Sequence, residues 1–275
     1  MKLWPSLRAI LPAALLALSA LHAAPVQAES VIETIQKRGT LKVGLSTFVP
    51  WAMRDKDGAL IGYEIDVAKK VAADMGVEVE FIPTDWAGII PALLAEKFDV
   101  IIGGMSITPE RNLTVNFTEP YAHSGVQLLA NKALAGSFTT LEQFNDPAVT
   151  IACRRGATPC AMSETLFPKA TLLQFDDDNQ AVQEVLNGNA HAAPLSAPKP
   201  AFSAEENPDK LFVALDGKNL IQGDEAFALR KGDPDALNFF SNWIIVNTSN
   251  GFLAERQAYW FGGQAAWKDT VAAEQ

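Results

Sequence analysis

The chain has 275 residues, and its formal net charge of −10 makes it an acidic protein. An acidic surface is poorly suited to bind the phosphate backbone of nucleic acids or an anionic lipid surface, so we expect neither partner. The length allows one large domain or two smaller ones.

Residues 1–28 are expected to be a signal peptide rather than part of the fold. Lys2 and Arg8 give a positive start, an Ala/Leu-rich run follows, and Val26–Ala28 supplies small residues for cleavage. A membrane anchor is the less favoured alternative, because Pro12 interrupts a short apolar run. We therefore expect export to the periplasm.

The next hundred residues alternate strands with helices. Strands are expected at Leu41–Leu45, Val79–Ile82 and Phe98–Ile102, with helices at Tyr63–Met75 and from an Asp85 cap through Leu94. Gly76 is a typical residue for ending the first helix. This order predicts a parallel α/β sheet with right-handed crossovers.

The third strand ends in a stretch suited to bind an anion, Gly103–Arg111. Its two glycines allow close approach of a ligand to the backbone, and Ser106 supplies a hydroxyl. Thr108 is placed to cap a short helix, and Arg111 offers a planar fork of donors that fits a carboxylate. The alternative is a plain strand–turn–helix whose arginine pairs with a neighbouring acid.

The pattern changes after Arg111 and then alternates again. Val115–Phe117 is expected to be a short extended segment that Pro120 breaks, and an apolar run follows at Val126–Ala130. Later strands are expected at Val149–Ala152, Thr171–Phe175, Ala190–Leu195, Leu211–Leu215 and Glu225–Leu229. Later helices are expected from Thr158 with Pro159 at the first position, and at Asn179–Leu186, Ala197–Glu206, Asp235–Thr248 and Gly251–Trp260.

Two α/β units of similar size predict two lobes that face each other. We expect residues 29–130 to form most of the first lobe, residues 131–220 to be the inserted second lobe, and residues 221–275 to return and complete the first. Two extended segments, near Gln127–Asn131 and Gly217–Phe227, would form the hinge. The ligand site of such sheets lies beyond the carboxyl ends of the strands, and two lobes on a hinge can close on a ligand.

Cys153 and Cys160 are the two cysteines of the chain. An even pair in an oxidising compartment predicts a disulfide. A zinc or redox site is not supported, since the spacing is not that of a Cys-x-x-Cys motif and the histidines are scattered. Asp176–Asp178 is read as a helix cap rather than a metal cluster. No metal ion or cofactor is expected.

A series of motifs along the first half of the chain carries a family resemblance. The motifs are Asp57-Gly58 with Gly62–Ala68, Trp86 with Ile90–Leu93, Asp99 with Met105–Arg111, and Val115–Thr118 with Pro120-Tyr121. In order and spacing they resemble the family 3 bacterial extracellular solute-binding proteins, the polar amino acid receptors of ABC importers. The resemblance implies a two-lobe periplasmic-binding-protein type II fold, each lobe an α/β sheet, joined by a two-segment hinge.

The resemblance also implies a ligand site drawn from both lobes. Arg111 would hold the α-carboxylate of the ligand, helped by Ser106 and the backbone near Gly104. Phe48 would pack on the ligand, and Trp86 would form part of the wall; the less favoured alternative is that either aromatic is simply a core residue. In the second lobe Gly156 and Thr158 match a turn at a helix N-terminus suited to the same carboxylate.

Ser196 departs from the family pattern, which usually has an aspartate there to pair with the ligand's ammonium group. A buried ammonium group without a carboxylate partner is costly. Either another acid supplies the charge, or the ligand is not an ordinary α-amino acid. Arg154 and Arg155 could lie on a solvated surface, or could face the cleft and favour a ligand with extra negative charge.

The leading hypothesis is a non-enzymatic, monomeric periplasmic receptor. It would bind an amino acid or similar small carboxylate-bearing solute and deliver it to an inner-membrane permease, with no catalytic residues. The runner-up is an exported lyase that resembles cyclohexadienyl dehydratase, although the sequence offers no obvious general acid for it. A third possibility is a sensor that docks on a receptor.

Overall fold

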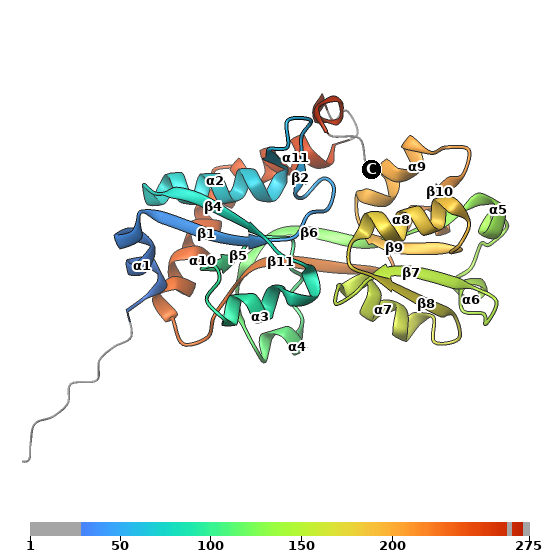
Figure 1. Ribbon diagram of the computed structural model, residues 1–275, viewed down its shortest axis with the longest axis horizontal. Helices are drawn as coiled ribbons and strands as arrows, with labels where there is room; N and C mark the ends of the chain where they lie inside the picture. Colours follow the sequence, from blue (N-terminus) through green and yellow to red (C-terminus); the bar gives the residue numbers. More distant parts are fainter. Residues whose placement is uncertain (1–28, 263–265, 272–275) are drawn as a thin grey trace, which may run out of the picture.

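The computed structural model describes residues 29–262 and 266–271, so the expected signal peptide lies outside it. Two α/β bodies lie side by side along the long axis, and two long strands run from one to the other (Figure 1). We call the body containing β1 the first lobe and the body containing β7 the second lobe.

The first lobe begins with α1 (Val31–Arg38) and is built on a parallel sheet. Its further elements are β1 (Thr40–Leu45), β2 (Met53–Arg54), β3 (Leu60–Ile61), α2 (Tyr63–Met75), β4 (Glu78–Pro83), η1 (Trp86–Gly88), α3 (Ile89–Leu94), β5 (Val100–Ile101) and α4 (Pro109–Asn112). The strand order is β4-β1-β5, and both pairings are parallel, as the sequence predicted. Gly76 ends α2 in the left-handed conformation.

The second lobe repeats the alternation. Its elements are α5 (Lys132–Ala135), α6 (Leu141–Phe144), β7 (Thr150–Arg154), α7 (Thr158–Leu166), β8 (Thr171–Phe175), α8 (Asp178–Asn187), β9 (Ala192–Ser196), α9 (Lys199–Glu206), β10 (Leu211–Val213) and η2 (Leu215–Gly217). Strand β7 pairs with β8 and with β9 in parallel. Asp177 caps α8 by accepting the backbone N–H of Gln180, in line with the predicted cap.

Strands β6 (Asn116–Asn131) and β11 (Ile221–Leu229) connect the lobes and join the strands of both into one continuous sheet, in the order β4-β1-β5-β11-β6-β9-β7-β8. The expectation that Pro120 breaks the first of these segments is wrong, because β6 is one continuous strand of 16 residues. Proline is tolerated there since it lies beside a register irregularity, where Ala226 of β11 pairs with Pro120. At such a bulge the missing N–H of proline removes no regular ladder bond.

Two helix starts also differ from the prediction. Asp85 precedes the short 3-10 helix η1 and makes no side-chain capping bond, while Gly88 precedes α3. An extra turn of 3-10 helix therefore separates Asp85 from the helix it was expected to cap. In α7 the first residue is Thr158 and Ala157 is the cap, so Pro159 takes the second position.

Helices α10 (Pro234–Ser249) and α11 (Phe252–Phe261) pack on the first lobe. The indole Nε1 of Trp243 donates a hydrogen bond to Asp74 (2.8 Å), and that of Trp260 donates to Asp66 (2.7 Å). Both acids lie on α2, so the two C-terminal helices are tied to it.

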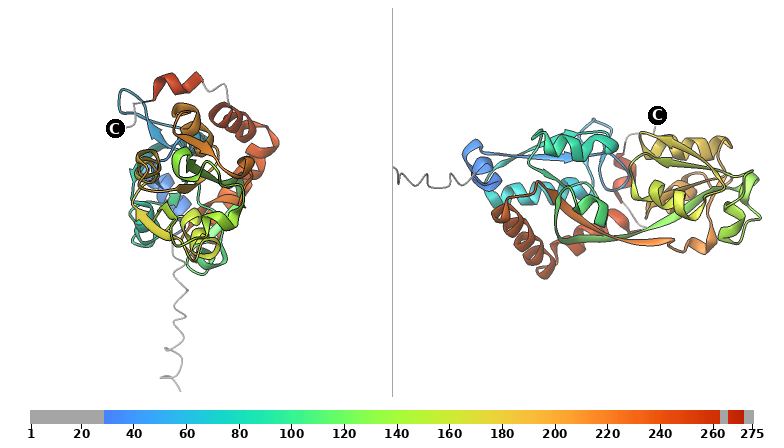
Figure 2. Two further views of the ribbon diagram at one scale, coloured as in Figure 1. Left: turned by 90° about the vertical axis from the view of Figure 1, so that its right-hand side faces the viewer. Right: turned by 90° about the horizontal axis from the view of Figure 1, so that it is seen from below.

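A last segment, residues 266–271 with helix η3 (Ala266–Thr270), touches both lobes. The ring of Trp267 lies 5.6 Å from that of Trp260 in the first lobe and 5.6 Å from that of Phe202 on α9 in the second. Lys268 forms an ion pair with Glu205 of α9. We call this segment the C-terminal strap. It lies at the top of the molecule near the junction of the two bodies in Figure 1, and again at the top in the left view of Figure 2.

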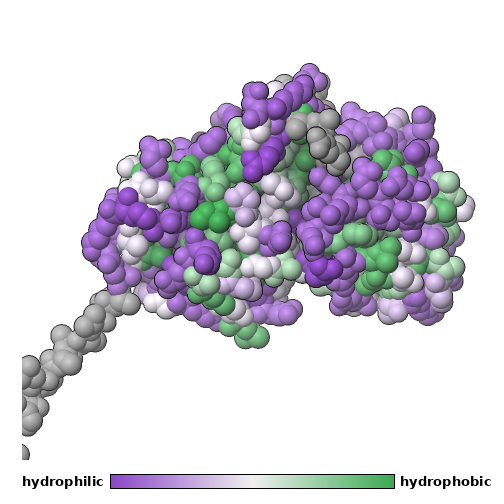
Figure 3. Space-filling view, in the orientation of Figure 1, coloured by the Kyte–Doolittle hydropathy of each residue, from purple (hydrophilic) through white to green (hydrophobic). Residues whose placement is uncertain are grey.

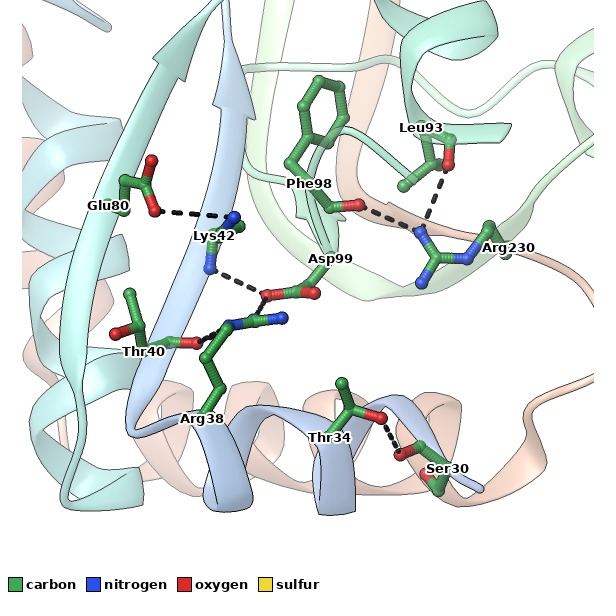
Figure 4. A network of polar contacts seen from close by, with 10 residues as sticks. All are labelled: Ser30, Thr34, Arg38, Thr40, Lys42, Glu80, Leu93, Phe98, Asp99 and Arg230. Carbon is green, nitrogen blue, oxygen red and sulfur yellow. Dashed lines mark hydrogen bonds and ion pairs between the residues drawn. The ribbon is translucent and has the colours of Figure 1, made fainter. Parts of the chain in front are cut away.

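A buried polar network fixes the start of β5 (Figure 4). The carboxylate of Asp99 accepts the backbone N–H of Lys42 on β1 (2.8 Å) and pairs with Arg38 of α1. Arg230, after β11, donates to the carbonyl of Phe98 (2.9 Å). These contacts set the position of the strand that leads into Gly103–Arg111.

Hydrophilic residues cover most of the face shown in Figure 3, with apolar patches between them. Among the described residues, no helix has both the length and the apolar character needed to cross a membrane.

Candidate functional site

Arg111 lies on α4, just beyond β5, and contacts both lobes. Its backbone N–H donates to the Oγ1 of Thr108 (3.1 Å), which is the predicted cap. Its guanidinium donates from Nη1 to the carbonyl of Ser106 (2.9 Å) and from Nη2 to the carbonyl of Gly156 across the interlobe boundary (3.1 Å). Burial, followed by the positive charge of Arg154, lowers the pKa of Arg111.

Gly104 occupies a position that no larger residue could take without rearrangement. Its φ is +63°, and a Cβ there would lie 2.8 Å from the Cζ of Phe48. Its backbone N–H donates to the hydroxyl of Tyr121 (2.9 Å). The glycine thus lets the strand end approach both aromatic rings.

Phe48 and Trp86 are buried on the first lobe, and both face a guanidinium from the second. The Cζ atom of Arg154 lies 4.9 Å from each ring centroid, within the range of a cation–π contact. Phe48 also stacks on Trp51, with centroids 5.6 Å apart. The two aromatics therefore serve both the packing and the interlobe boundary.

The two neighbouring arginines point in different directions. Arg154, the last residue of β7, is 5% exposed, whereas Arg155 is exposed and pairs with Asp176 on the surface. The sequence left open whether this pair faces the cleft or the solvent. Arg154 faces inward, and Arg155 lies on the solvated surface.

Two buried carboxyl groups, which the sequence reasoning missed, lie under the site. Tyr121 donates to Glu64 (2.6 Å), and burial raises the pKa of Glu64 to about 8 despite that hydrogen bond. Burial likewise raises the pKa of Glu225 to about 8, although the hydroxyl of Ser124 donates to its Oε1 (2.6 Å). Both groups are thus largely protonated at neutral pH.

Glu225 keeps one oxygen, Oε2, that is buried and has no hydrogen-bond partner among the described residues. The backbone of Glu225 pairs with that of Ser106 through an isolated β-bridge. A Cβ at Gly223 would lie 3.0 Å from the Oε1 of Glu225 and 3.5 Å from the Oγ of Ser106, so those side chains converge. For Glu225, the sequence signal that could have revealed it is an acid at the start of an otherwise apolar predicted strand, Glu225–Leu229. For Glu64, the signal is its position within the Gly62–Ala68 motif.

These residues form a continuous ring, which we call the interlobe cluster. Each member contacts the next, except that Glu64 and Glu225 are linked by the effect of Glu225 on the pKa of Glu64. The contact that closes the ring is between Arg111 and Trp86, where the Cζ atom lies 5.9 Å from the ring centroid. The members are Arg154, Phe48, Gly104, Tyr121, Glu64, Glu225, Ser106, Arg111 and Trp86. Cations and carboxyl groups occupy separate parts of the ring.

Of the predicted site residues in the second lobe, two lie at the interlobe boundary. Gly156 approaches the first lobe so closely that a Cβ would lie 3.3 Å from the Cα of Ala87. Thr158 opens α7 and, with Arg111 and Gly156, lines a groove of about 470 Å³ between the lobes. Ser196 ends β9 beside Val126 of β6 and has no described contact with the cluster.

Cys153 and Cys160 form the predicted disulfide, with a sulfur–sulfur distance of 2.04 Å. The bridge joins β7 to α7, on either side of the turn that carries Arg154 and Gly156. The bridge therefore restrains the turn that presents both residues to the first lobe. Among residues 29–262 and 266–271, no three potential ligands gather in a way that could hold a metal ion.

Known proteins are similar to this chain along most of its length. The L-cystine-binding protein TcyJ of Escherichia coli is 28% identical over 235 residues, which cover 85% of this chain and 87% of that protein. Cyclohexadienyl dehydratase of Pseudomonas aeruginosa is 26% identical over 256 residues, covering 90% and 92%. The crystal structure of the ancestral amino acid-binding protein AncCDT-1, a precursor of cyclohexadienyl dehydratase, matches with a TM-score of 0.78 and 37% identity, covering 85% and 100%.

The model of one family, the bacterial extracellular solute-binding proteins of family 3, matches residues 41–263. That span includes both lobes, the two connecting strands and every member of the interlobe cluster. The chain belongs to the bacterial extracellular solute-binding proteins, family 3.

Proposed function

We propose that this protein is the periplasmic receptor of an ABC importer, and that it binds a small amino-acid-like solute between its lobes. The observation that carries the proposal is Arg111, whose guanidinium lies at the interlobe boundary and donates to a carbonyl of each lobe. A ligand held there contacts both lobes at once, so binding favours the closed arrangement. A membrane permease would recognise that closed arrangement and accept the solute.

The α-carboxylate of the ligand binds Arg111. A guanidinium carries five N–H donors, and the carbonyls of Ser106 and Gly156 use two of them while fixing the orientation of the fork. The remaining donors can form charge-assisted hydrogen bonds to a carboxylate. Gly104, Ser106 and Thr158 complete this end of the site.

Glu225 is our candidate for the acid that Ser196 does not provide. Its Oε2 atom is buried without a hydrogen-bond partner, and its side chain converges with Ser106 next to Arg111. An ammonium group on the ligand would satisfy that oxygen and return the carboxyl to its charged form. In this chain, Glu225 on β11 would thus supply the acid that the family usually carries at the end of β9.

The variant Arg111→Ala tests this role. Truncating one partner of a buried charged hydrogen bond typically costs about 2–5 kcal/mol, so we expect affinity to fall by at least thirtyfold (about 2 kcal/mol). Calorimetric titration with the twenty amino acids and a set of small organic acids would measure it. The matched control is Arg155→Ala, which removes an exposed arginine. Unchanged affinity in Arg111→Ala would remove the proposed anchor.

A second candidate function is a lyase reaction like that of cyclohexadienyl dehydratase. The specific observation in its favour is that Glu64 and Glu225, with pKa values raised to about 8, are protonated at neutral pH and could act as general acids. Incubation with prephenate, followed at the absorbance of the product, tests it. Turnover that is lost in Glu225→Gln would favour the enzyme, whereas the absence of turnover together with tight amino acid binding favours the receptor.

A further inference from the structure

Arg154 is the most unusual charged residue of the interlobe boundary, because it is buried against the lobe opposite its own. It comes from β7 of the second lobe, and its guanidinium lies between Phe48 and Trp86 of the first lobe, 4.9 Å from each ring. Closure of the lobes therefore brings a positive charge into the place between the two aromatics.

The hydrogen-bonding capacity of this guanidinium is not used up. Its Nε and Nη1 atoms are buried and have no hydrogen-bond partner among the described residues. Asp178 provides an ion pair at 3.5 Å from Nη1, which is too long for a good hydrogen bond. Asp178 thus balances part of the charge and orients the group, while buried N–H donors still lack an acceptor.

Arg154 and Arg111 also lie close enough for the charge of Arg154 to lower the pKa of Arg111. Their guanidinium groups each lie within 6 Å of the ring of Trp86. Two neighbouring cations in a partly desolvated site raise the free energy of the protein unless anionic groups pair with them. A single carboxylate on Arg111 would leave the donors of Arg154 without an acceptor.

We propose that Arg154 binds a second anionic group of the ligand, so that the protein prefers amino acids that carry two carboxylates to those that carry one. This inference rests on the proposed function, in which Arg111 takes the first carboxylate. In this arrangement the ligand's ammonium group meets Glu225, which pairs with Ser106 just as Arg111 donates to the carbonyl of Ser106.

The second carboxylate can come from either of two places in the ligand. In L-glutamate and L-aspartate it lies on the side chain. In opines such as octopine it lies on a carboxyalkyl group attached to the amino nitrogen. Both present the same chemistry to Arg154, and separate titrations distinguish them.

The experiment is a calorimetric titration of the wild-type chain with matched ligand pairs. L-glutamate is compared with L-glutamine, L-aspartate with L-asparagine, octopine with L-arginine, and L-lysine serves as a second cation. We expect at least one dicarboxylate to bind about tenfold or more tightly than its partner without the second carboxylate, the size of effect typical of one charged hydrogen bond.

Variants then assign the effect to the residue. In Arg154→Gln the preference for the dicarboxylate over its partner should disappear, because the dicarboxylate loses more affinity than the partner that has a single carboxylate. In Arg154→Lys, which keeps the charge but not the planar fork, part of the preference should remain. Arg155→Gln is the matched control and should leave every affinity unchanged.

The possible failures are distinguishable. If the wild-type chain binds glutamine, arginine or lysine as tightly as any dicarboxylate, the inference about Arg154 is wrong and the receptor function stands. Equal losses for acid and amide in Arg154→Gln would assign Arg154 a structural role only. If no amino acid or opine binds at all, the proposed function itself fails. Should the Gln variant not fold, the wild-type ranking and the Lys variant decide.

Discussion

At the scale of single residues, the carboxyl group of Glu225 links ligand binding to pH. Burial raises its pKa to about 8, so the group is mostly protonated at pH 7 and charged above pH 8. An ammonium partner favours the charged form and lowers this pKa in the complex. Below pH 8, binding an ammonium group must therefore release a proton.

We predict that the affinity for L-glutamate rises as pH increases from 6 to 8 and levels off above 8. The sign follows because the free protein holds a proton that the complex gives up, and this proton is harder to remove at low pH. The slope approaches tenfold per pH unit where the free carboxyl is fully protonated and the bound one fully charged. Calorimetry at several pH values, in buffers of different ionisation enthalpy, measures both the affinity and the released proton.

Glu225→Gln should weaken binding and flatten this profile, because the amide neither titrates nor carries charge. Asp224→Asn is the matched control, since Asp224 is the neighbouring acid but is exposed and paired with His123. A wild-type affinity that stays constant from pH 6 to 8 would contradict the assignment of Glu225 to the ammonium group.

Sequence reasoning reached Arg111 and its cap because a short motif places them next to each other in the chain. It did not decide between Arg154 and Arg155, since adjacent residues at a strand end point to opposite sides and either could face inward. Glu225 was missed for a different reason: its partners, Ser106 and Ser124, are about a hundred residues distant in sequence. Contacts of that kind depend on how β6 and β11 pair, which periodicity does not reveal.

At the scale of secondary-structure elements, strands and helices with clear periodicity were predicted well. Helix α2 matches its predicted bounds, and β8 matches as well. The errors arose where tertiary structure overrides local signals. Pro120 continues in β6 because a bulge in β11 accepts it, and Asp85 loses its expected capping role to an added turn of 3-10 helix.

Strand β5 shows how an element positions the site from a distance. It has only two residues, and Ile102 alone separates it from Gly103 and Gly104. Its start is held by Asp99, which is 6% exposed and accepts from Lys42 while pairing with Arg38. A change at Asp99 should therefore affect stability and the alignment of the Gly103–Arg111 segment together.

We predict that Asp99→Ala lowers the free energy of unfolding by about 2–3 kcal/mol, because it leaves a buried N–H without its acceptor and Arg38 without its partner. Urea denaturation followed by circular dichroism measures the change. The matched control is Glu80→Ala, which breaks an exposed ion pair to the same Lys42 (3.8 Å) and should cost less than about 1 kcal/mol. Equal effects of the two variants would show that the Asp99 network adds no stability.

At the scale of the whole molecule, three segments of the described chain bridge the lobes. Strands β6 and β11 cross between them, and the C-terminal strap lies against both. The two-lobe pattern of the sequence predicted crossing segments near Gln127–Asn131 and Gly217–Phe227. It placed the terminal segment with the first lobe and gave no sign that Trp267 also packs on Phe202, because that contact joins distant parts of the chain.

We predict that Trp267→Ala loosens the closed arrangement. Trp267 is 3% exposed, and removing its ring leaves a cavity between Trp260 and Phe202. The expected cost is about 3 kcal/mol, and small-angle scattering should show a larger radius of gyration. Asp269→Ala, an exposed position in the same segment, is the control. An unchanged radius in Trp267→Ala would mean that the strap does not restrain the lobes.

The position of Trp267 has a spectroscopic consequence. One neighbouring ring, Trp260, belongs to the first lobe and the other, Phe202, to the second. Any separation of the lobes must therefore pull Trp267 away from at least one aromatic neighbour and admit water to its indole. Its emission would shift to longer wavelength as the lobes part, so the chain carries an intrinsic fluorophore that reports opening without an attached dye.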